Sequence, residues 1–243
     1  MPVSDGITLI PLHGIGEIEP GADLARTVAD ALAPAVPDGP VLQQGDVLVI
    51  TQKVVSKAEG RLVAIDSDDP SAKTALVEQE SVRIVRRRGD LIISETRHGF
   101  ICANAGIDLS NVALGTAALL PEDSDRSARR IRAGLRTALR VDVGVIISDT
   151  FGRTWRRGVT DVAIGCAGVA AVIDLRGTLD ANGRELVATE VCVADELASA
   201  AELVMGKDRG IPAAIVRGVP AEWLRRASVR TEIVRPPDED LFR

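Results

Sequence analysis

Val143-Gly144-Val145-Ile146-Ile147-Ser148-Asp149-Thr150 is the stretch that decides the fold of this chain. Its first six residues form a compact, mostly β-branched run, which predicts a buried strand. Asp149 and Thr150 follow where the apolar run ends, and Arg153 comes shortly after them. In α/β folds, binding groups gather beyond the carboxyl ends of strands, because the strand fixes the backbone while the following loop carries polar side chains. The stretch therefore predicts an α/β protein with a functional site after this strand.

The polar residues after this strand suit a site for a metal ion and a phosphate. Carboxylate and hydroxyl oxygens are ligands for Mg²⁺ or Mn²⁺. The guanidinium groups of Arg153, Arg156 and Arg157 match phosphate or carboxylate oxygens in pairs. Alternatively, Asp149 caps the following turn and the arginines lie on a solvated face. The stretch alone leaves both interpretations open.

The composition is that of a folded, soluble protein. With 243 residues, the chain is long enough for one large domain or two closely packed ones. A hydrophobic fraction of 46% and a charged fraction of 26% argue against wholesale disorder, and an aromatic fraction of 2% leaves little material for stacking nucleic-acid bases. The net charge of -6 argues against a general electrostatic hold on nucleic acid or on an anionic membrane.

The cysteines and the N-terminal residues predict a cytoplasmic protein. Cys102, Cys166 and Cys192 lie in apolar surroundings without close pairs, so we expect small buried side chains and neither disulfides nor a zinc site. Residues 1–10 lack the basic region and the apolar run of a secretion signal, and no later run reaches membrane-spanning length.

Apolar runs and amphipathic periods along the chain predict alternating strands and helices. In chain order, we expect a strand at 7–11, a helix at 22–32 ended by the prolines of 34–40, a strand at 46–50, a polar loop at 66–73, a helix at 72–85, an exposed basic turn at 86–90, a hairpin of 91–95 with 99–103, a helix at 124–139, the strand at 143–148, a Gly- and Ala-rich, closely packed stretch at 163–172, a helix at 194–205, a strand at 211–216 and a charged tail at 229–243.

The loop after the first predicted strand contains Gly14 and Gly16, which resemble the start of a dinucleotide fingerprint. Glu19 occupies the third glycine position and no long strand precedes the loop, so we reject a Rossmann site. The backbone of this loop can still approach a ligand closely.

Gln52, Lys53 and Lys57 come directly after the strand predicted at 46–50. A lysine ammonium group can act as a point charge on the phosphates of a nucleoside triphosphate. The alternative for Lys57 is an ordinary solvated side chain, and the sequence of this segment does not exclude it.

Asp108 and Asn111 follow the second strand of the predicted hairpin. Asp108 is thus a second acid presented beyond a strand end, and Asn111 can turn its amide toward the same pocket. Asp108 can equally cap a turn or helix. We expect the isolated His98 to be structural. Asp195 and Glu196 are candidates for a general base, although capping of the following helix is the simpler interpretation.

Several of these stretches, taken together, resemble one family, the coenzyme F420:γ-glutamyl ligases (CofE and the N-terminal domain of FbiB). The resemblance runs through nearly the whole chain in order, and it is more specific than any single motif above. The segments that carry it are 45–60 (GDVLVITQKVVSKAEG), 103–112 (ANAGIDLSNV), 143–165 (VGVIISDTFGRTWRRGVTDVAIG), 183–187 (GRELV), 193–197 (VADEL) and 210–218 (GIPAAIVRG).

The resemblance implies GTP-dependent formation of an amide between a carboxylate of the deazaflavin precursor F420-0 and the amino group of L-glutamate. It implies an α/β fold with α+β character, in which residues 1–243 form one CofE-like ligase domain of two interwoven subdomains and assemble into an intertwined homodimer. The implied cofactors are two Mg²⁺ or Mn²⁺ ions and a K⁺ ion, besides GTP as cosubstrate.

The resemblance also assigns roles to individual residues. The loop 206–210 is shorter than in archaeal members, so its nucleotide and metal contacts transfer less firmly. From its chemistry and not from the resemblance, Arg153 is expected to act in catalysis with Asp108 and Asp149, by holding phosphate or the acidic precursor. The implied divalent-metal ligands are Asp108, Asp149 and Thr150, the implied GTP contacts are Gln52, Lys53, Lys57 and Asn111, and the implied nucleotide-binding segment is Ile15, Gly16, Glu17 and Ile18.

The chemistry of the residues agrees with these implied roles. A carboxylate does not condense with an amine in water, because hydroxide is a poor leaving group, so the acid must first be phosphorylated to an acyl phosphate. Two acids at separate strand ends can hold the cations that such a phosphoryl transfer needs. The alternatives are a related nucleotide-dependent ligase acting on a different acid, or a non-catalytic binding protein on the same scaffold. Intact Asp108, Asp149 and Lys57 argue against the second alternative.

Overall fold

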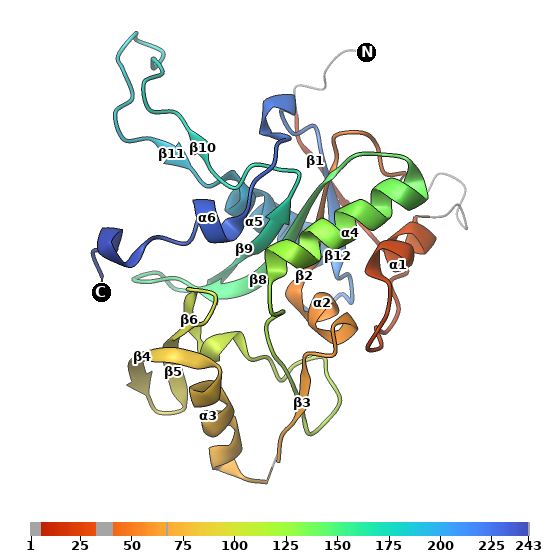
Figure 1. The fold of residues 1–243 in the computed structure, drawn as a ribbon, viewed down its shortest axis with the longest axis vertical. Coiled ribbons are helices and arrows are strands. Elements are labelled where there is room, and N and C mark those ends of the chain that lie inside the picture. Colours follow the sequence, from red (N-terminus) through yellow and green to blue (C-terminus); the bar gives the residue numbers. More distant parts are fainter. Residues whose placement is uncertain (1–5, 33–40, 67, 243) are drawn as a thin grey trace.

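A computed structural model describes residues 6–32, 41–66 and 68–242 (Figure 1). Its centre is a five-stranded sheet in the order β1-β12-β2-β8-β9. In this sheet β2 and β8 pair in parallel, and the other neighbours pair antiparallel. The mixed α/β architecture confirms the α/β part of the expected fold class, and the two interwoven subdomains stay a prediction. The strands are β1 (Thr8–Pro11), β2 (Val47–Thr51), β8 (Gly144–Gly152), β9 (Val159–Ala167) and β12 (Ala213–Arg217).

Helices cover both faces of the central sheet (Figure 1). Because side chains alternate along a strand, Leu48 and Ile50 of β2 face one hydrophobic cluster, while Val47 and Val49 face another. The first cluster includes the apolar faces of α1 (Leu24–Ala31), α2 (Gln52–Ala58) and α4 (Ser124–Leu139), and the second those of α5 (Val193–Met205) and α6 (Val229–Glu232).

A third hydrophobic cluster lies among the elements between α2 and α4, below the central sheet in Figure 1. A separate hairpin arm, residues 173–191, projects from the opposite side of the molecule. The elements of the lower region are β3 (Leu62–Ala64), α3 (Pro70–Gln79), β4 (Ser81–Arg88), β5 (Leu91–Thr96), β6 (Ile101–Ala103) and β7 (Thr116–Ala118), and those of the arm are β10 (Ile173–Asp174) and β11 (Glu190–Val191).

The strand register brings distant segments to one edge of the central sheet. The carboxyl ends of β2 and β8 meet where Thr51 pairs with Ser148. β12 runs in the opposite direction, and Pro212 just before it accepts a hydrogen bond from the Thr51 N–H (2.9 Å). Near the start of β9, Asp161 pairs with Thr150. Segments that are far apart in sequence therefore converge at the edge where α/β folds bind their ligands.

Two sequence predictions in the lower region are wrong. The helix predicted at 72–85 ends at Gln79, and Ser81 already begins β4. The residues 86–88 are not a turn but the end of β4, where they pair with 91–93 of β5. The turn consists of Gly89 and Asp90 alone, with Gly89 at a φ of +56°. Pairing with β5 determines the conformation here, against a helical pattern that is only local.

Most of the other predicted elements are confirmed, including the first strand, the 91–103 hairpin and the helices at 22–32, 124–139 and 194–205. The predicted end of the first helix at 34–40 lies outside the described residues. The strand β9 was not predicted as such, but its small residues pack closely as expected. A Cβ on Gly165 would lie 2.4 Å from the backbone carbonyl carbon of Ser124, so only glycine lets β9 approach α4 this closely.

The charged segment 229–243 begins inside the fold. Val229 is fully buried, and Asp125 on α4 accepts hydrogen bonds from the N–H groups of Val229 (2.9 Å) and Arg230 (3.1 Å). The three cysteines are free, and Cys102 and Cys166 are buried as predicted, whereas Cys192 is only partly buried. None of the described helices combines the length and the apolarity that crossing a membrane requires.

Candidate functional site

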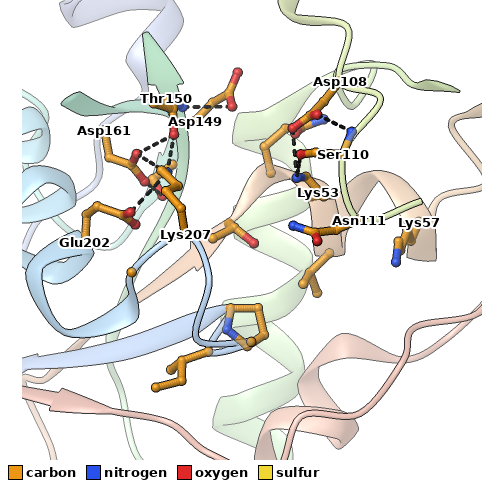
Figure 2. A pocket seen from close by; sticks show the side chains of 18 of the residues that line it. Lys53, Lys57, Asp108, Ser110, Asn111, Asp149, Thr150, Asp161, Glu202 and Lys207 are labelled. Carbon is orange, nitrogen blue, oxygen red and sulfur yellow. Dashed lines mark hydrogen bonds and ion pairs between the residues drawn. The ribbon is translucent and has the colours of Figure 1, made fainter. Parts of the chain in front are cut away.

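A pocket of about 880 Å³ lies at the edge of the sheet where the strand ends converge (Figure 2). Seven separate parts of the chain line it: the segment after β1, the start of α2, the loop after β6, the outer part of β8, the start of β9, the end of α5 and the loop before β12. The structure brings all the predicted metal and nucleotide residues into this pocket, whereas Arg153 is not among its lining residues. Their roles stay predictions at this point.

The segment 15–18 reaches the pocket because β1 ends at the same sheet edge, where Pro11 pairs with Ala214. Ile15 and Ile18 are buried in the first hydrophobic cluster, while the intervening Gly16 and Glu17 are exposed. The two isoleucines therefore anchor a short stretch whose backbone remains accessible to a ligand.

The start of α2 places two lysines at the pocket. β2 ends at Thr51 and α2 begins at Gln52. Lys53 and Lys57 are four residues apart in this helix, so their side chains lie on the same face, about one turn from each other. Gln52 is buried, and its amide nitrogen donates to Ser56 Oγ (2.8 Å) and to the Leu119 carbonyl (3.1 Å). Lys57 is only 8% exposed, so the alternative of a solvated Lys57 is wrong.

Lys57 forms an ion pair with Glu17 of the segment after β1. The pair joins two of the predicted nucleotide-binding parts across the pocket. Glu17 is exposed, and Lys57 can exchange its carboxylate for a phosphate oxygen, because both are anionic acceptors.

Asp108 forms a compact polar group with Lys53 and Ser110 (Figure 2). Its carboxylate lies 2.8 Å from Lys53 Nζ and accepts the Ser110 N–H at 2.7 Å. Lys53 Nζ also donates to Ser110 Oγ (2.8 Å). Burial alone would raise the pKa of Asp108, but the hydrogen bonds from Lys53 and Ser110 hold this pKa below its usual value. Asp108 is therefore a carboxylate at neutral pH.

The loop that carries Asp108 has an unusual backbone. Asn104, Ala105 and Asn111 all have a positive φ, near +50°, and for the buried Ala105 this conformation is strained. Asn104 Oδ1 accepts the Ile92 N–H of β5 (3.1 Å), and Ala105 packs in the third hydrophobic cluster. Packing against β5 thus fixes the loop in a conformation that its sequence does not favour.

Asp149 and Thr150 lie on a strand and not in a loop, so that part of the prediction is wrong. β8 continues to Gly152 because it pairs with β9, whereas its parallel neighbour β2 ends opposite Ser148. A register shift in the β8–β9 pairing occurs between Ile147 and Ser148. Such irregularities re-aim side chains beside functional sites. The outer part of β8 therefore presents Asp149 and Thr150 to the pocket.

Asp149 is in an unfavourable environment for a charged group. Burial raises the pKa of Asp149 to about 7, and the negative charges of Asp161 and Asp108 act in the same direction. The Thr150 N–H donates to Asp149 Oδ1 (2.8 Å), which opposes the shift only in part. Asp108 and Asp149 are thus close enough to repel each other, and a cation between them would relieve that repulsion.

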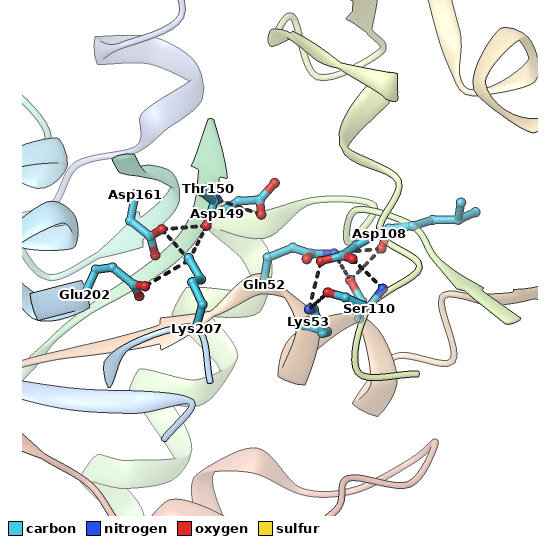
Figure 3. A network of polar contacts seen from close by, with 11 residues as sticks. Gln52, Lys53, Asp108, Ser110, Asp149, Thr150, Asp161, Glu202 and Lys207 are labelled. Carbon is cyan, nitrogen blue, oxygen red and sulfur yellow. Dashed lines mark hydrogen bonds and ion pairs between the residues drawn. The ribbon is translucent and has the colours of Figure 1, made fainter. Parts of the chain in front are cut away.

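Sequence reasoning missed a second polar group, formed by Asp161, Glu202 and Lys207 beside Thr150 (Figure 3). Lys207 Nζ lies 2.8 Å from Asp161 Oδ1 and 3.2 Å from Glu202 Oε1, and it also donates to Thr150 Oγ1. One signal was present: Asp161 is an acid inside an apolar strand, where a charge is retained only with a partner. Lys207 belongs to the loop whose contacts the resemblance transferred less firmly.

Comparison with known proteins decides the family. A family model described as "F420-0:Gamma-glutamyl ligase" matches residues 14–218. The chain belongs to this ligase family. The match confirms the resemblance seen in the sequence, and membership makes the protein an enzyme that forms a carbon–nitrogen bond.

Curated relatives of the ligase agree with this assignment, and each of the following carries the name coenzyme F420:L-glutamate ligase. The protein of Methanopyrus kandleri is 47% identical over 93% of this chain and 94% of its own length. The protein of Methanothermobacter thermautotrophicus is 44% identical over 98% of this chain and 99% of its own length. The protein of Methanocaldococcus jannaschii is 39% identical over 83% and 86%.

The side chains of the ligase pocket suit a divalent cation that is bound partly by the protein and partly by a phosphate. Among the described residues, no three His, Cys, Asp or Glu side chains come together as a closed metal cage. Asp108, Asp149 and Thr150 instead offer two carboxylates and a hydroxyl, which are hard oxygen ligands. Mg²⁺ is commonly bound in this way, by one or two carboxylates with substrate phosphates and waters completing its shell.

The other candidates of the ligase sequence lie outside the lining of this pocket. Arg153 is exposed on the β8–β9 hairpin and donates to the Arg157 carbonyl (3.0 Å). Asp195 accepts the Ala163 N–H (2.8 Å) and so ties α5 to β9, while Glu196 is exposed. His98 Nε2 lies 2.9 Å from the Pro121 carbonyl, and its ring stacks on a phenylalanine, in agreement with a structural role.

Proposed function

We propose that this ligase joins L-glutamate, through its amino group, to a carboxylate of the deazaflavin precursor F420-0, with GTP as cosubstrate. The names of the family and of the curated relatives support the acid and the amino acid. The observation that carries the proposal is the convergence of Asp108 and Asp149 on one pocket that also contains Lys53 and Lys57. Such a set of charges suits the transfer of a phosphoryl group.

The proposed reaction has two steps. First, an oxygen of the precursor carboxylate attacks the γ-phosphorus of GTP, the bond to the bridging oxygen breaks, and GDP leaves with the electron pair. The product is an acyl phosphate. In the second step the neutral amino group of glutamate attacks the acyl carbon, phosphate leaves, and the nitrogen loses a proton to give the amide. Both steps depend chiefly on orientation and on neutralising negative charge.

The residues of the pocket divide the work by their chemistry. The nucleotide would be held by the backbone of 15–18 and by Gln52, Lys53, Lys57 and Asn111, and Lys53 would also position Asp108 beside it. Asp108, Asp149 and Thr150 would hold Mg²⁺ or Mn²⁺, two ions in all, and a K⁺ ion is part of the same proposal. When bound, the divalent ions supply charge neutralisation at the phosphoryl oxygens.

We also propose the intertwined homodimer as the active form. The arm 173–191 projects from the protomer, and its Leu179 and Val187 are 68% and 79% exposed. Exposed apolar side chains on an extended arm are typical of a segment that packs against another chain. Arg153, which is also exposed, remains our candidate for a contact with phosphate or with the acidic precursor.

The direct test is a product assay with the full chain. Purified protein is incubated with the deazaflavin precursor, L-glutamate, GTP and Mn²⁺, and the products are identified by mass spectrometry. We expect a product heavier by one or more glutamyl residues together with GDP, and we expect no product without glutamate or without nucleotide. ATP in place of GTP measures the preference for guanine.

Two outcomes would contradict the proposal in different ways. Consumption of GTP with a different acid, and none with the precursor, would favour a related ligase. Failure of GTP and Mn²⁺ together to raise the melting temperature would argue that the pocket does not bind nucleotide at all, since a ligand at a hundred times its Kd stabilises a fold by about 2.7 kcal/mol.

A further inference from the structure

Asp161 is the most enclosed acid of the pocket. It lies on β9 directly opposite Thr150 and is 1% exposed. Moving a carboxylate from water into the protein interior costs on the order of several kcal/mol in lost hydration. Hydrogen bonds and opposite charges at its oxygens must offset that cost. A simple apolar residue would serve the packing of β9 without this cost, so the retention of an acid at this position calls for a specific purpose.

Both carboxylate oxygens of Asp161 accept hydrogen bonds, and Figure 3 shows those from Thr150 and Lys207. Oδ2 accepts the Ser148 hydroxyl at 3.0 Å. Oδ1 accepts the Thr150 hydroxyl at 2.7 Å and Lys207 Nζ at 2.8 Å. The Ser199 hydroxyl donates to the Asp161 backbone carbonyl at 2.7 Å, which fixes the strand to α5. These contacts hold the Asp161 carboxylate in one orientation, in which it contacts both Thr150 and Lys207 at the pocket.

The contact with Thr150 determines which way that hydroxyl points. A hydroxyl has one proton to donate and two lone pairs with which to accept. The Thr150 proton is directed to Asp161, so both lone pairs of the oxygen point away from Asp161. One of them accepts Lys207. A hydroxyl that donates to a carboxylate is also a more electron-rich acceptor, as is known for groups that support metal ligands from behind.

The contact with Lys207 keeps a cation at the pocket wall. Lys207 Nζ lies 2.8 Å from Asp161 Oδ1 and 3.2 Å from Glu202 Oε1, so two carboxylates hold this ammonium group in place. Its chain segment, the loop before β12, is thereby tied to the β8–β9 pair across the pocket.

We propose that Asp161 is a positioning residue: it turns the Thr150 oxygen toward a divalent cation and holds the Lys207 ammonium group beside it. The inference rests on the proposed function, because it requires that the pocket binds a divalent cation. Glu202 supports Lys207 but has no contact with Thr150 among its described hydrogen bonds and ion pairs.

The test is the affinity of the full chain for Mn²⁺, measured by the loss of the free-ion electron paramagnetic resonance signal, without nucleotide and with GDP. Asp161→Asn keeps the size of the side chain but lacks the charge, and we expect its Kd for Mn²⁺ to be about tenfold higher than in the wild type. Glu202→Gln is the matched control, since it removes one negative charge from the same pocket without touching Thr150. Its Kd should rise less than about threefold.

A double-mutant cycle separates positioning from a general loss of structure or charge. In Thr150→Val the hydroxyl is gone, so adding Asp161→Asn should change the Mn²⁺ affinity much less than it does in the wild type. Additive effects of the two substitutions would overturn the proposal. If Asp161→Asn does not fold, as judged by circular dichroism, Ser148→Ala takes its place. This variant removes the hydrogen bond to Asp161 Oδ2 and so loosens the same carboxylate. An unchanged Kd in that variant would also overturn it.

Mn²⁺ binding distinguishes a failure of the proposed function from a failure of the positioning role of Asp161. A wild-type chain that binds no Mn²⁺ would overturn the proposed function and this role with it. A wild-type chain that binds Mn²⁺, with the same Kd in Asp161→Asn, would overturn the positioning role alone.

Discussion

Asp149→Asn is expected to lower the rate of glutamate ligation at least about a hundredfold, the effect of removing one charge-stabilising group from an active site. The amide keeps the size of the carboxyl group and still accepts the Thr150 N–H, which bonds Asp149 at 2.8 Å. It lacks the negative charge that would hold a divalent cation opposite Asp108. Initial rates at saturating GTP and glutamate, with Mn²⁺ titrated, measure the effect.

The same variant should melt at or above the temperature of the wild type. Folding raises the pKa of Asp149 from about 4 in the unfolded chain to about 7. The charge of Asp149 therefore destabilises the folded state increasingly as the pH rises from about 4 to about 7, and by the full amount above pH 7. Asn carries no charge and avoids the penalty. The exposed Asp30→Asn is the matched control, with wild-type rate and stability. A near-normal rate in Asp149→Asn with ordinary dependence on Mn²⁺ would refute the assigned role.

Arg217→Ala is expected to reduce the free energy of unfolding by about 3 kcal/mol, because it leaves the buried carboxylate of Asp46 without its partly exposed partner. Asp46, at the start of β2, is 2% exposed and accepts Arg217 Nε at 2.9 Å and Nη2 at 2.7 Å. The Gln43 N–H is its other described donor (2.8 Å). Without the guanidinium group, a carboxylate stays buried with its charge uncompensated. Urea unfolding followed by circular dichroism measures the loss.

Arg26→Ala is the control for this prediction. Arg26 and Asp30 form an ion pair of 3.8 Å between highly exposed side chains, and such pairs contribute less than about 1 kcal/mol. If Arg217→Ala reduced the free energy of unfolding no more than Arg26→Ala does, water would have to solvate Asp46 in the variant. The Asp46–Arg217 pair would then not be what fixes β12 against β2.

The sequence predicted the central elements because burial leaves a local pattern. Residues 144–148 form the inner part of β8, which is covered on both faces, and such strands form nearly continuous apolar runs. Ala128, Ile131 and Leu135 recur at the helical period because α4 buries one face only. In both places local sequence and tertiary environment agree.

The elements that were misjudged lack such a pattern. β4 is an edge strand whose side chains are mostly exposed, so pairing with β5 defines it and burial does not. The outer part of β8 is likewise extended by its pairing with β9, beyond the apolar run. Cross-strand pairing involves residues distant in sequence, and a local reading of the chain does not contain it.

In the site, too, some features are encoded in the local sequence and others depend on contacts between distant residues. Asp108, Asp149 and Lys57 each stood out locally as polar residues after apolar runs, and the family resemblance supplied their roles. Their convergence depends on the strand order β12-β2-β8-β9, which no segment encodes alone. The one local signal for Asp161 is an acid inside an apolar strand, and the contacts that give it a role are made across the sheet and with the loop before β12.

The central claim is that Asp108 and Asp149 act together on a nucleotide-bound cation. The most direct measurement is a crystal structure of the protein with GDP and Mn²⁺, in which anomalous scattering locates the manganese. We predict manganese within about 2.5 Å of carboxylate oxygens from both aspartates, with phosphate oxygens of GDP completing the coordination. Manganese and GDP bound elsewhere, or bound in this pocket with neither aspartate as a ligand, would contradict the account.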